Sequence, residues 1–273
     1  MGPKKSSHST AKPPPKSSTS TPPTPPPNWP PFKPLLPVSD LSLQTLIPSQ
    51  IITIPNFWTG TLCKTYVNFL KTLPLTTTPG KPKKGDALRF NDRFQVNDER
   101  FANRLWEETG LRELVLGENG DEGEGDGMSE SESERRELWG GEVIGLNPSI
   151  RIYRYTKGQF FDQHYDESNV LTLNTKPSST PARTTWTLLL YLTSPATGCQ
   201  GGETVFYPDE IQFPGRKNLI DKEFVVGLET GLVLLHKHGN DCMLHEGREV
   251  TDGEKWVLRT DLCVKREKSR FAD

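Results

Sequence analysis

The part of the chain that most restricts its fold begins at residue 143, where short runs of aromatic and β-branched residues follow one another to residue 264. Gly, Pro, Asn and Asp separate these runs, and each run has the length of a strand. The strand candidates are SIRIYRYTKG, QFFDQHYD, TTWTLLLYLT, GGETVFY, EFVVGLETG, LVLLHKHG and EKWVLRTDLCV. Many short strands at close spacing indicate an antiparallel sandwich or barrel.

Two helices are expected ahead of these strands. In TGTLCKTYVNFLKTL, Thr59 or Thr61 can cap a run whose apolar residues recur at intervals of three and four. In NDERFANRLWEETG, Asn97 or Asp98 can cap the helix and Gly110 can end it. We therefore expect a mainly β fold with flanking helices.

Two segments have a composition that cannot build a core. Residues 1–37 are rich in Pro, Ser and Thr, with lysines and no acidic residue, and residues 117–137 interleave Asp and Glu with Gly and Ser. We expect residues 1–45 to form a disordered, partly polyproline II tail. Residues 46–268 are expected to form the folded domain, interrupted by a disordered acidic loop near residues 117–137.

The chain has 273 residues and a net charge of −2, enough for one large domain or two small ones. The tail lacks the apolar stretch of a signal peptide, and no later segment is long enough to span a bilayer. The four cysteines, at positions 63, 199, 242 and 263, show no metal or redox spacing. We expect an intracellular protein, cytoplasmic or nuclear, without membrane or nucleic-acid partners. Its tail is a candidate ligand for proline-recognising modules.

A candidate metal site begins in the run QFFDQHYD. Side chains two apart in a strand point to the same face, so His164 and Asp166 can converge. His245 is the candidate third ligand. Two imidazoles and one carboxylate leave coordination positions open, which is the facial arrangement of non-haem Fe(II). Zinc is the weaker candidate because it prefers a closed or single-water tetrahedral site.

A candidate anion partner follows the third ligand. Lys255 comes ten residues after His245, on a strand that faces a closed interior. A buried ammonium needs an anionic partner, and a dicarboxylate cosubstrate would supply one. Arg259, four residues on and on the same face, is the alternative partner.

Two other features compete for a functional role. His236 and His238 also lie two apart and could imitate a metal pair, but no carboxylate and lysine pattern surrounds them. Hydrogen-bonded histidines near the rim of the sheet are the preferred interpretation. The segment LRFNDRFQ is either a surface turn or a loop that faces the substrate.

These motifs together resemble the prolyl 4-hydroxylase-like Fe(II) and 2-oxoglutarate-dependent dioxygenases. The resemblance implies a double-stranded β-helix, or jelly roll, with helices packed outside. It assigns His164, Asp166 and His245 to iron and Lys255 to the distal carboxylate of 2-oxoglutarate. Tyr155 matches a tyrosine that lines the cosubstrate pocket in this family.

The resemblance also implies an activity. An enzyme of this kind hydroxylates an unactivated carbon, releases succinate and carbon dioxide, and is supported by ascorbate. A prolyl residue of a protein is the candidate target, although the substrate is otherwise unknown, whether protein or small molecule. An inactive jelly-roll scaffold that binds partners through its tail and acidic loop is the alternative, and a zinc hydrolase would have no use for Lys255. The insertion ESNVLTLNTKPSSTPAR after Asp166 departs from the family pattern.

Overall fold

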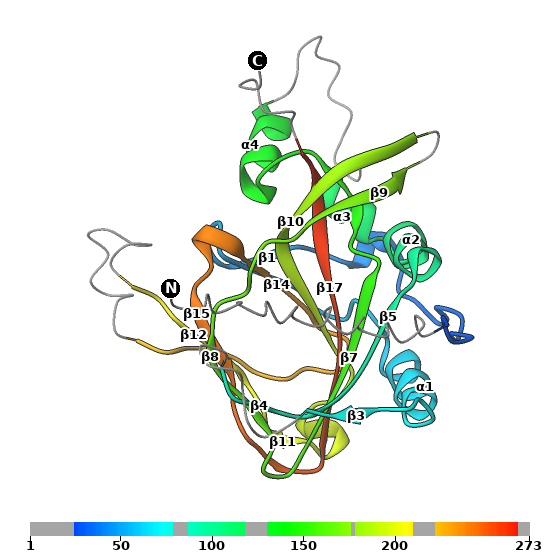
Figure 1. The fold of residues 1–273 in the computed structure, drawn as a ribbon, viewed down its shortest axis with the longest axis vertical. Coiled ribbons are helices and arrows are strands. Elements are labelled where there is room, and N and C mark those ends of the chain that lie inside the picture. Colours follow the sequence, from blue (N-terminus) through cyan, green and yellow to red (C-terminus); the bar gives the residue numbers. More distant parts are fainter. Residues whose placement is uncertain (1–24, 79–86, 118–129, 176–177, 210–221, 267–273) are drawn as a thin grey trace, which may run out of the picture.

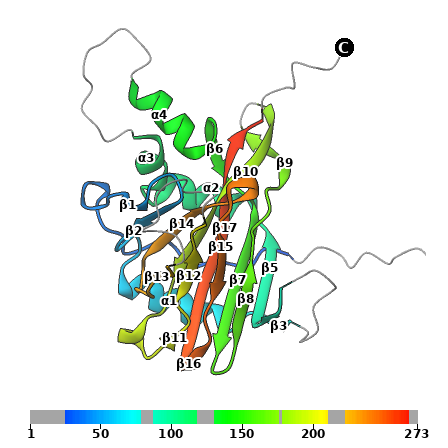
Figure 2. The same ribbon diagram turned by 90° about the vertical axis from the view of Figure 1, so that its left-hand side faces the viewer.

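The computed structural model describes residues 25–78, 87–117, 130–175, 178–209 and 222–266. In this part of the chain two antiparallel sheets, one of ten strands and one of five, form the body of the molecule (Figures 1 and 2). The main path of the larger sheet runs in the order β1 (Gln44–Ile47), β2 (Ile51–Ile54), β14 (Val233–Lys237), β10 (Ser178–Tyr191), β17 (Glu254–Lys265), β7 (Ser149–Thr156), β5 (Asp92–Asn97) and β3 (Thr76–Thr77). Two further strands join it, β6 (Val143–Leu146) beside β17 and β9 (Val170–Thr175) beside β10.

The smaller sheet faces the inner side of the larger one. Its strands run in the order β13 (Phe224–Val226), β12 (Thr204–Tyr207), β15 (Leu244–Gly247), β8 (Phe160–His164) and β4 (Arg89–Phe90). A separate pair consists of β11 (Gln200–Gly201) and β16 (Val250–Asp252). From β7 onward the chain crosses repeatedly between the two sheets, from β7 to β8, back to β10, over to β12 and β13, and then through β14, β15 and β17. This alternation is the double-stranded β-helix, so the expected fold class is confirmed.

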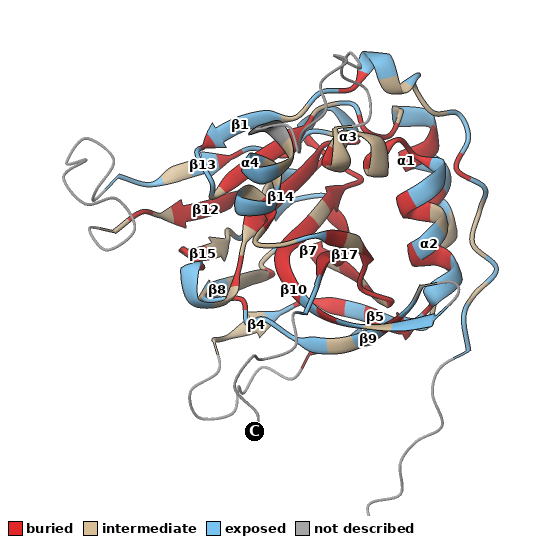
Figure 3. Ribbon diagram, turned by 90° about the horizontal axis from the view of Figure 1, so that it is seen from above, coloured by how far each residue is buried: buried red, intermediate tan, exposed pale blue. Residues whose placement is uncertain are grey.

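Strand alternation separates two apolar layers. On β17, Trp256 and Leu258 belong to the outer cluster, which also contains the apolar residues of the helices. Val257, between them, belongs to the inner cluster with Phe206 of the smaller sheet. Because successive side chains of a strand point to opposite faces, one strand serves both layers. Figure 3 shows the central strands as the most continuously buried part of the molecule.

The helices α1 (Gly60–Leu70) and α2 (Glu99–Glu108) cover the outer face of the larger sheet (Figures 1 and 3). Both begin at the expected caps, because Thr59 accepts a hydrogen bond from the Leu62 amide and Asp98 accepts one from the Phe101 amide. Gly110, at a φ of 79°, separates α2 from the shorter α3. The other helices in the described part of the chain are α3 (Leu111–Leu116), α4 (Glu130–Trp139) and three 3-10 turns at Val38–Asp40, Pro195–Thr197 and Gly239–Asp241.

The expected boundary between tail and domain is wrong. Residues 25–45 are part of the folded structure, and Phe32 is 4% exposed. The Phe32 ring packs against the rings of Trp58 and Tyr66, and the Trp29 indole donates a hydrogen bond to Asp98. Residues 25–37, called the strap below, were expected to be disordered because they are rich in proline. Two aromatic residues, Trp29 and Phe32, nevertheless anchor the strap to the domain. Residues 1–24 lie outside the described residues.

The expected C-terminal boundary of the acidic loop is also wrong. Residues 130–137 lie in α4, and Trp139 at the end of this helix is buried. The Trp139 indole donates a hydrogen bond to the Val115 carbonyl and its ring packs edge-on against Trp186. The central part of the expected loop, residues 118–129, lies outside the described residues.

Two further observations complete the fold. Much of the insertion after Asp166 forms a hairpin of β9 and the first half of β10, a segment that lies outside the expected strands. Among the described residues, no helix has the length and apolar character needed to cross a membrane.

Candidate metal centre and cosubstrate cavity

Strand pairing brings the two candidate histidine ligands together. His164 is the last residue of β8, and His245 of β15 is its cross-strand partner. Their ring centroids are 4.2 Å apart. Directly paired residues of an antiparallel sheet place their side chains on the same face, so both imidazoles enter the space between the sheets. The sequence separation of the two histidines gave no indication of this pairing.

Both imidazoles are oriented by backbone carbonyl groups. His164 Nδ1 lies 2.8 Å from the Asp162 carbonyl oxygen, and His245 Nδ1 lies 2.9 Å from that of Met243. A carbonyl oxygen only accepts, so each Nδ1 carries the proton. Each Nε2 therefore keeps its lone pair and is free to bind a metal.

Asp166 completes the candidate triad. Its Oδ1 lies 3.8 Å from His164 Nε2, and its Oδ2 lies 3.8 Å from His245 Nε2. The donor atoms of the three residues all lie within 4.8 Å of one another. The Asp166 amide donates to Cys242 Sγ at 3.2 Å, which anchors the backbone just beyond the end of β8.

Protonation states suit metal binding. Burial, followed by the charge of His245, lowers the pKa of His164 to about 3. Burial also lowers the pKa of His245. Burial alone would raise the pKa of Asp166, but the positive charge of Arg259 holds it well below its usual value. Two neutral imidazoles and one ionised carboxylate are therefore present at neutral pH.

Lys255 lies in the same cavity, on the inner face of β17. Its side chain is buried, and Nζ donates a hydrogen bond to the Gly202 carbonyl at 2.6 Å. The ammonium also lies 5.4 Å from the ring centre of Tyr155 and 5.5 Å from that of Tyr191. Burial lowers the pKa of Lys255 to about 8. A buried ammonium hydrogen-bonded to a neutral carbonyl can accept an anionic ligand.

Tyr155 lines this cavity as expected. It is the cross-strand partner of Lys255, and burial, followed by the neighbouring Tyr153, raises its pKa. The residues that line the cavity are Tyr153, Tyr155, Phe161, His164, Asp166, Leu189, Thr204, His236, His245, Glu246, Gly247, Lys255, Val257 and Arg259. All six residues named as site candidates from the sequence therefore line one cavity.

The three alternative residues differ in their surroundings. Arg259 shares the inner face of β17 with Lys255, but its guanidinium pairs with Asp166. His238 is hydrogen-bonded to Thr184 and Thr187, as expected of a structural histidine. His236 differs from that expectation. It lies inside the barrel next to the triad, and among the described residues neither of its ring nitrogens has a hydrogen-bond partner.

The segment LRFNDRFQ divides between two sheets. Arg89 and Phe90 form β4 at the edge of the smaller sheet, beside β8, whereas Asp92 lies in β5 and pairs with Arg154. The Arg89 guanidinium lies over the rings of Tyr153 and Phe161, which line the cavity. Only the first part of this segment therefore borders the site.

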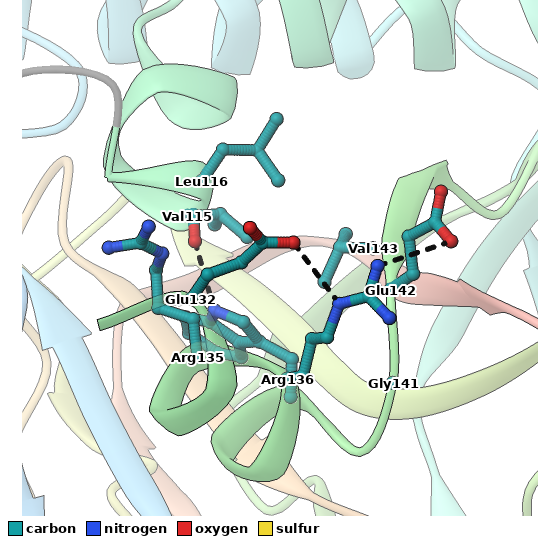
Figure 4. Close-up of a pocket in the computed structure, with 9 residues that line it drawn as sticks. Val115, Leu116, Glu132, Arg135, Arg136, Gly141, Glu142 and Val143 are labelled. Carbon is teal, nitrogen blue, oxygen red and sulfur yellow. Dashed lines mark hydrogen bonds and ion pairs between the residues drawn. The ribbon is translucent and has the colours of Figure 1, made fainter. Parts of the chain in front are cut away.

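A second hollow lies between α3, α4 and β6 (Figure 4). Within it, Arg136 pairs with both Glu132 and Glu142. This hollow lies beside Trp139 and apart from the triad. It does not share the donor set of the central cavity.

The sequence of the ligand-bearing half of the chain matches a known family. Residues 150–260 fit the family model described as the 2OG-Fe(II) oxygenase superfamily. This segment is similar to the 2OG-Fe(II) oxygenase superfamily. The matched region contains the triad, Lys255 and Tyr155, and at this level the expected enzyme class, a 2-oxoglutarate-dependent dioxygenase, is confirmed. A comparison with curated proteins finds no significant match.

Solved structures with some similarity include three prolyl hydroxylases. A viral collagen prolyl hydroxylase from Paramecium bursaria Chlorella virus-1 has 16% identity and a TM-score of 0.42, covering 79% of this chain and 96% of its own. A Pseudomonas putida prolyl-4-hydroxylase has 11% identity and a TM-score of 0.43, covering 80% and 94%. A Trichoplax adhaerens prolyl hydroxylase, in complex with a hypoxia inducible factor fragment, has 13% identity and a TM-score of 0.46, covering 78% and 83%.

The residues present fit the cofactors that this superfamily implies. Two imidazole nitrogens with free lone pairs and an ionised carboxylate are the donor set of a non-haem Fe(II) site. Lys255 supplies a cation on the opposite sheet of the same cavity for a dicarboxylate such as 2-oxoglutarate. The triad and Lys255 therefore suit Fe(II) and 2-oxoglutarate by the chemistry of their side chains, which share one cavity.

Proposed function

We propose that the protein is an Fe(II)- and 2-oxoglutarate-dependent dioxygenase that hydroxylates an unactivated carbon and releases succinate and carbon dioxide. The observation that carries this proposal is the convergence of His164, Asp166 and His245 in one cavity with the buried cation of Lys255. An inactive scaffold would have no need to keep a metal donor set and a buried ammonium together, since both are costly to bury.

Each residue has a defined task in this proposal. His164, Asp166 and His245 hold the metal, and Lys255 holds the distal carboxylate of 2-oxoglutarate. Bound together, Fe(II) and 2-oxoglutarate would supply the chemistry by which O2 gives one oxygen atom to a C–H bond and the other to succinate. Leu189, Val257 and the aromatic residues of the cavity wall exclude water from the site. Ascorbate is proposed as a reductant that returns oxidised iron to Fe(II).

The edge formed by β4 and β8 is the proposed entrance for the substrate. Phe90, which pairs with Phe160 of β8, is 39% exposed, and Tyr165, the residue after the candidate ligand His164, is 57% exposed. The guanidinium of Arg89, next to Phe90, lies over the rings of Tyr153 and Phe161 in the cavity wall. Exposed aromatic side chains favour contact with a peptide. A prolyl residue of a protein is the proposed target because the sequence resemblance points to that class.

The proposal is tested by measuring succinate. Purified protein is loaded anaerobically with Fe(II), supplied with 2-oxoglutarate, and exposed to oxygen with and without proline-rich peptides. We expect succinate from the wild-type protein, a marked loss in His245→Ala, and no change in Lys64→Ala, an exposed substitution on α1. Hydroxylated product is identified by the mass of one added oxygen atom from isotopically labelled O2. Absence of succinate from metal-loaded wild-type protein under all these conditions would favour the inactive scaffold.

A further inference from the structure

Asp166 is held by groups outside its own strand. It lies two residues beyond the end of β8, in a stretch without strand pairing. The Gly239 amide donates a hydrogen bond to the Asp166 carbonyl at 2.9 Å, and the Asp166 amide donates to Cys242 Sγ at 3.2 Å. Both partners belong to the turn at residues 238–242, between β14 and β15. This turn therefore fixes the backbone of the candidate ligand on both sides.

The same turn reaches the carboxylate through a chain of buried hydrogen bonds. The Thr187 hydroxyl lies 2.8 Å from Asp166 Oδ2 and 2.9 Å from His238 Nδ1. On the other side of the ring, His238 Nε2 lies 2.9 Å from the Thr184 hydroxyl. That hydroxyl accepts a hydrogen bond from the Asn169 amide at 2.9 Å. The two threonines and the histidine are buried, so water does not compete for these bonds.

A β-bulge allows one imidazole to contact both threonines. Residues three apart in a regular strand point to opposite faces. In β10, however, the pairing with β17 shifts register between Thr184 and Trp186, which makes Thr185 an extra residue. The shift returns Thr184 to the face that carries Thr187. His238 can then bind both hydroxyls at once.

The donors and acceptors of this chain follow one direction. An ionised carboxylate only accepts, so Thr187 gives its single hydroxyl proton to Asp166 and must accept from His238. His238 Nδ1 therefore carries a proton. Burial lowers the pKa of His238, which keeps the ring neutral, so Nε2 accepts from the Thr184 hydroxyl. Every hydrogen bond in the chain thus points toward Asp166 Oδ2.

The chain distinguishes the two oxygens of the carboxylate. Oδ2 accepts from Thr187 and pairs with Arg259 Nη2 at 2.9 Å, and these two donors use both of its lone pairs. Among the described residues, no donor hydrogen-bonds to Oδ1, which lies 3.8 Å from His164 Nε2. The carboxylate is therefore oriented with Oδ1 left for a metal ion.

We propose that His238 is a positioning residue for Asp166, whose carboxylate it orients for the metal through Thr187. The inference rests on the proposed function, because it takes Asp166 as a metal ligand. It goes further by assigning metal affinity to two residues that do not line the cavity. A carboxylate that is already oriented loses less conformational freedom when it binds the ion.

The first test removes the link between His238 and the carboxylate. Co(II) serves as the probe because its visible absorption reports the number and geometry of its donors. Thr187→Val keeps the shape of the side chain without its hydroxyl, and we expect Co(II) binding to weaken by about 10–100-fold, the scale found for outer partners of metal ligands.

Thr185→Val is the matched control on the same strand. The Thr185 hydroxyl is buried without a hydrogen-bond partner among the described residues, so its loss should leave Co(II) affinity unchanged. The metal-free Tm of each variant shows that it is folded. Equal Co(II) affinities of the two valine variants would overturn the proposal.

The second test separates positioning from packing at His238 itself. Leu and Asn have similar sizes, but Asn can place an N–H near the position of His238 Nδ1. We expect His238→Leu to weaken Co(II) binding and change its spectrum, whereas His238→Asn should retain most of the affinity. In the Thr187→Val background His238→Leu should cause no further loss, because its effect passes through Thr187. Additive losses, or an equal loss in His238→Asn, would show a merely structural histidine.

His245→Ala distinguishes this inference from the proposed function. If His245→Ala loses Co(II) binding while Thr187→Val and His238→Leu bind Co(II) like the wild type, only the role of His238 fails. If His245→Ala also binds Co(II) like the wild type, the triad is wrong and both proposals fail.

Discussion

Arg259 and Asp166 form an ion pair inside the barrel, with Arg259 Nη2 2.9 Å from Asp166 Oδ2. Arg259 Nε also lies 3.7 Å from Asp261 Oδ1 on the same strand. The candidate metal ligand therefore has a permanent cationic neighbour. This pairing allows the carboxylate to stay ionised in a buried site before any metal arrives, and it links metal binding to the stability of the larger sheet.

Asp166→Ala is expected to do more than remove a ligand. It would leave the Arg259 guanidinium without its closest partner, and breaking a buried pair from one side costs about 3–5 kcal/mol. The structure therefore predicts a lower Tm for Asp166→Ala than for the wild type. Asp166→Asn, which keeps an oxygen for the Thr187 hydroxyl, should be the milder of the two. Differential scanning calorimetry of both variants, with Co(II) titrations, checks this order, and equal melting temperatures for Asp166→Ala and the wild type would contradict it.

In Arg259→Gln, the loss of metal affinity on acidification should begin at a higher pH than in the wild type. With Arg259 present, the pKa of Asp166 lies well below its usual value, so the carboxylate is ionised and its stabilising pairing persists as pH falls, until pH passes through that low pKa. Without Arg259, burial raises the pKa and the carboxyl takes up a proton at a higher pH. Co(II) affinity measured from neutral to acidic pH should therefore decline earlier in Arg259→Gln. Superimposable pH curves would show that Arg259 does not control this carboxylate.

Lys255→Ala should weaken binding of 2-oxoglutarate while leaving metal affinity unchanged. Loss of one partner of a buried charge pair costs about 3–5 kcal/mol, or about two to four decades in affinity. Lys255→Arg should retain part of the binding. Because the pKa of Lys255 is about 8, the affinity of the wild type should fall as pH rises through that value and the ammonium loses its proton. Calorimetric titration with 2-oxoglutarate in the presence of Ni(II) measures both effects. A loss in Arg259→Gln alone would transfer the role to Arg259.

Phe32→Ala should destabilise the domain although it lies far ahead of the candidate ligands in the sequence. Removing a buried Phe costs about 3–5 kcal/mol, and the Phe32 ring packs against Trp58, Tyr66 and Phe101. Lys33→Ala, an exposed neighbour, is the matched control and should melt like the wild type. Thermal unfolding of the two variants provides the measurement. A deletion of residues 1–37 that melts at the wild-type temperature would show that the strap contributes nothing to stability.

Local sequence patterns determined much of this structure. Runs of β-branched and aromatic residues predicted β7, β8, β12, β13, β14, β17 and the second half of β10, because strand propensity depends on neighbouring residues. For the same reason, cap candidates that include Thr59 and Asp98 predicted the starts of two helices. The spacing of His164 and Asp166 indicated a shared face for the same reason. Composition gave a wrong prediction of disorder near Phe32 and Trp139. Each of these large side chains is buried in a segment whose other residues are mostly polar or proline. Burial of a side chain depends on the surface that it packs against and not on the average composition of its segment.

Tertiary structure alone decided which residues became neighbours. Alternation along a strand tells which face a side chain occupies but not which strand lies opposite, so the pairing of His245 with His164 could not be read from the sequence. The same holds for the partner of Arg259 and for the buried place of His236 beside Asp166. These contacts join residues far apart in the chain, and they form only when the two sheets close around a common interior.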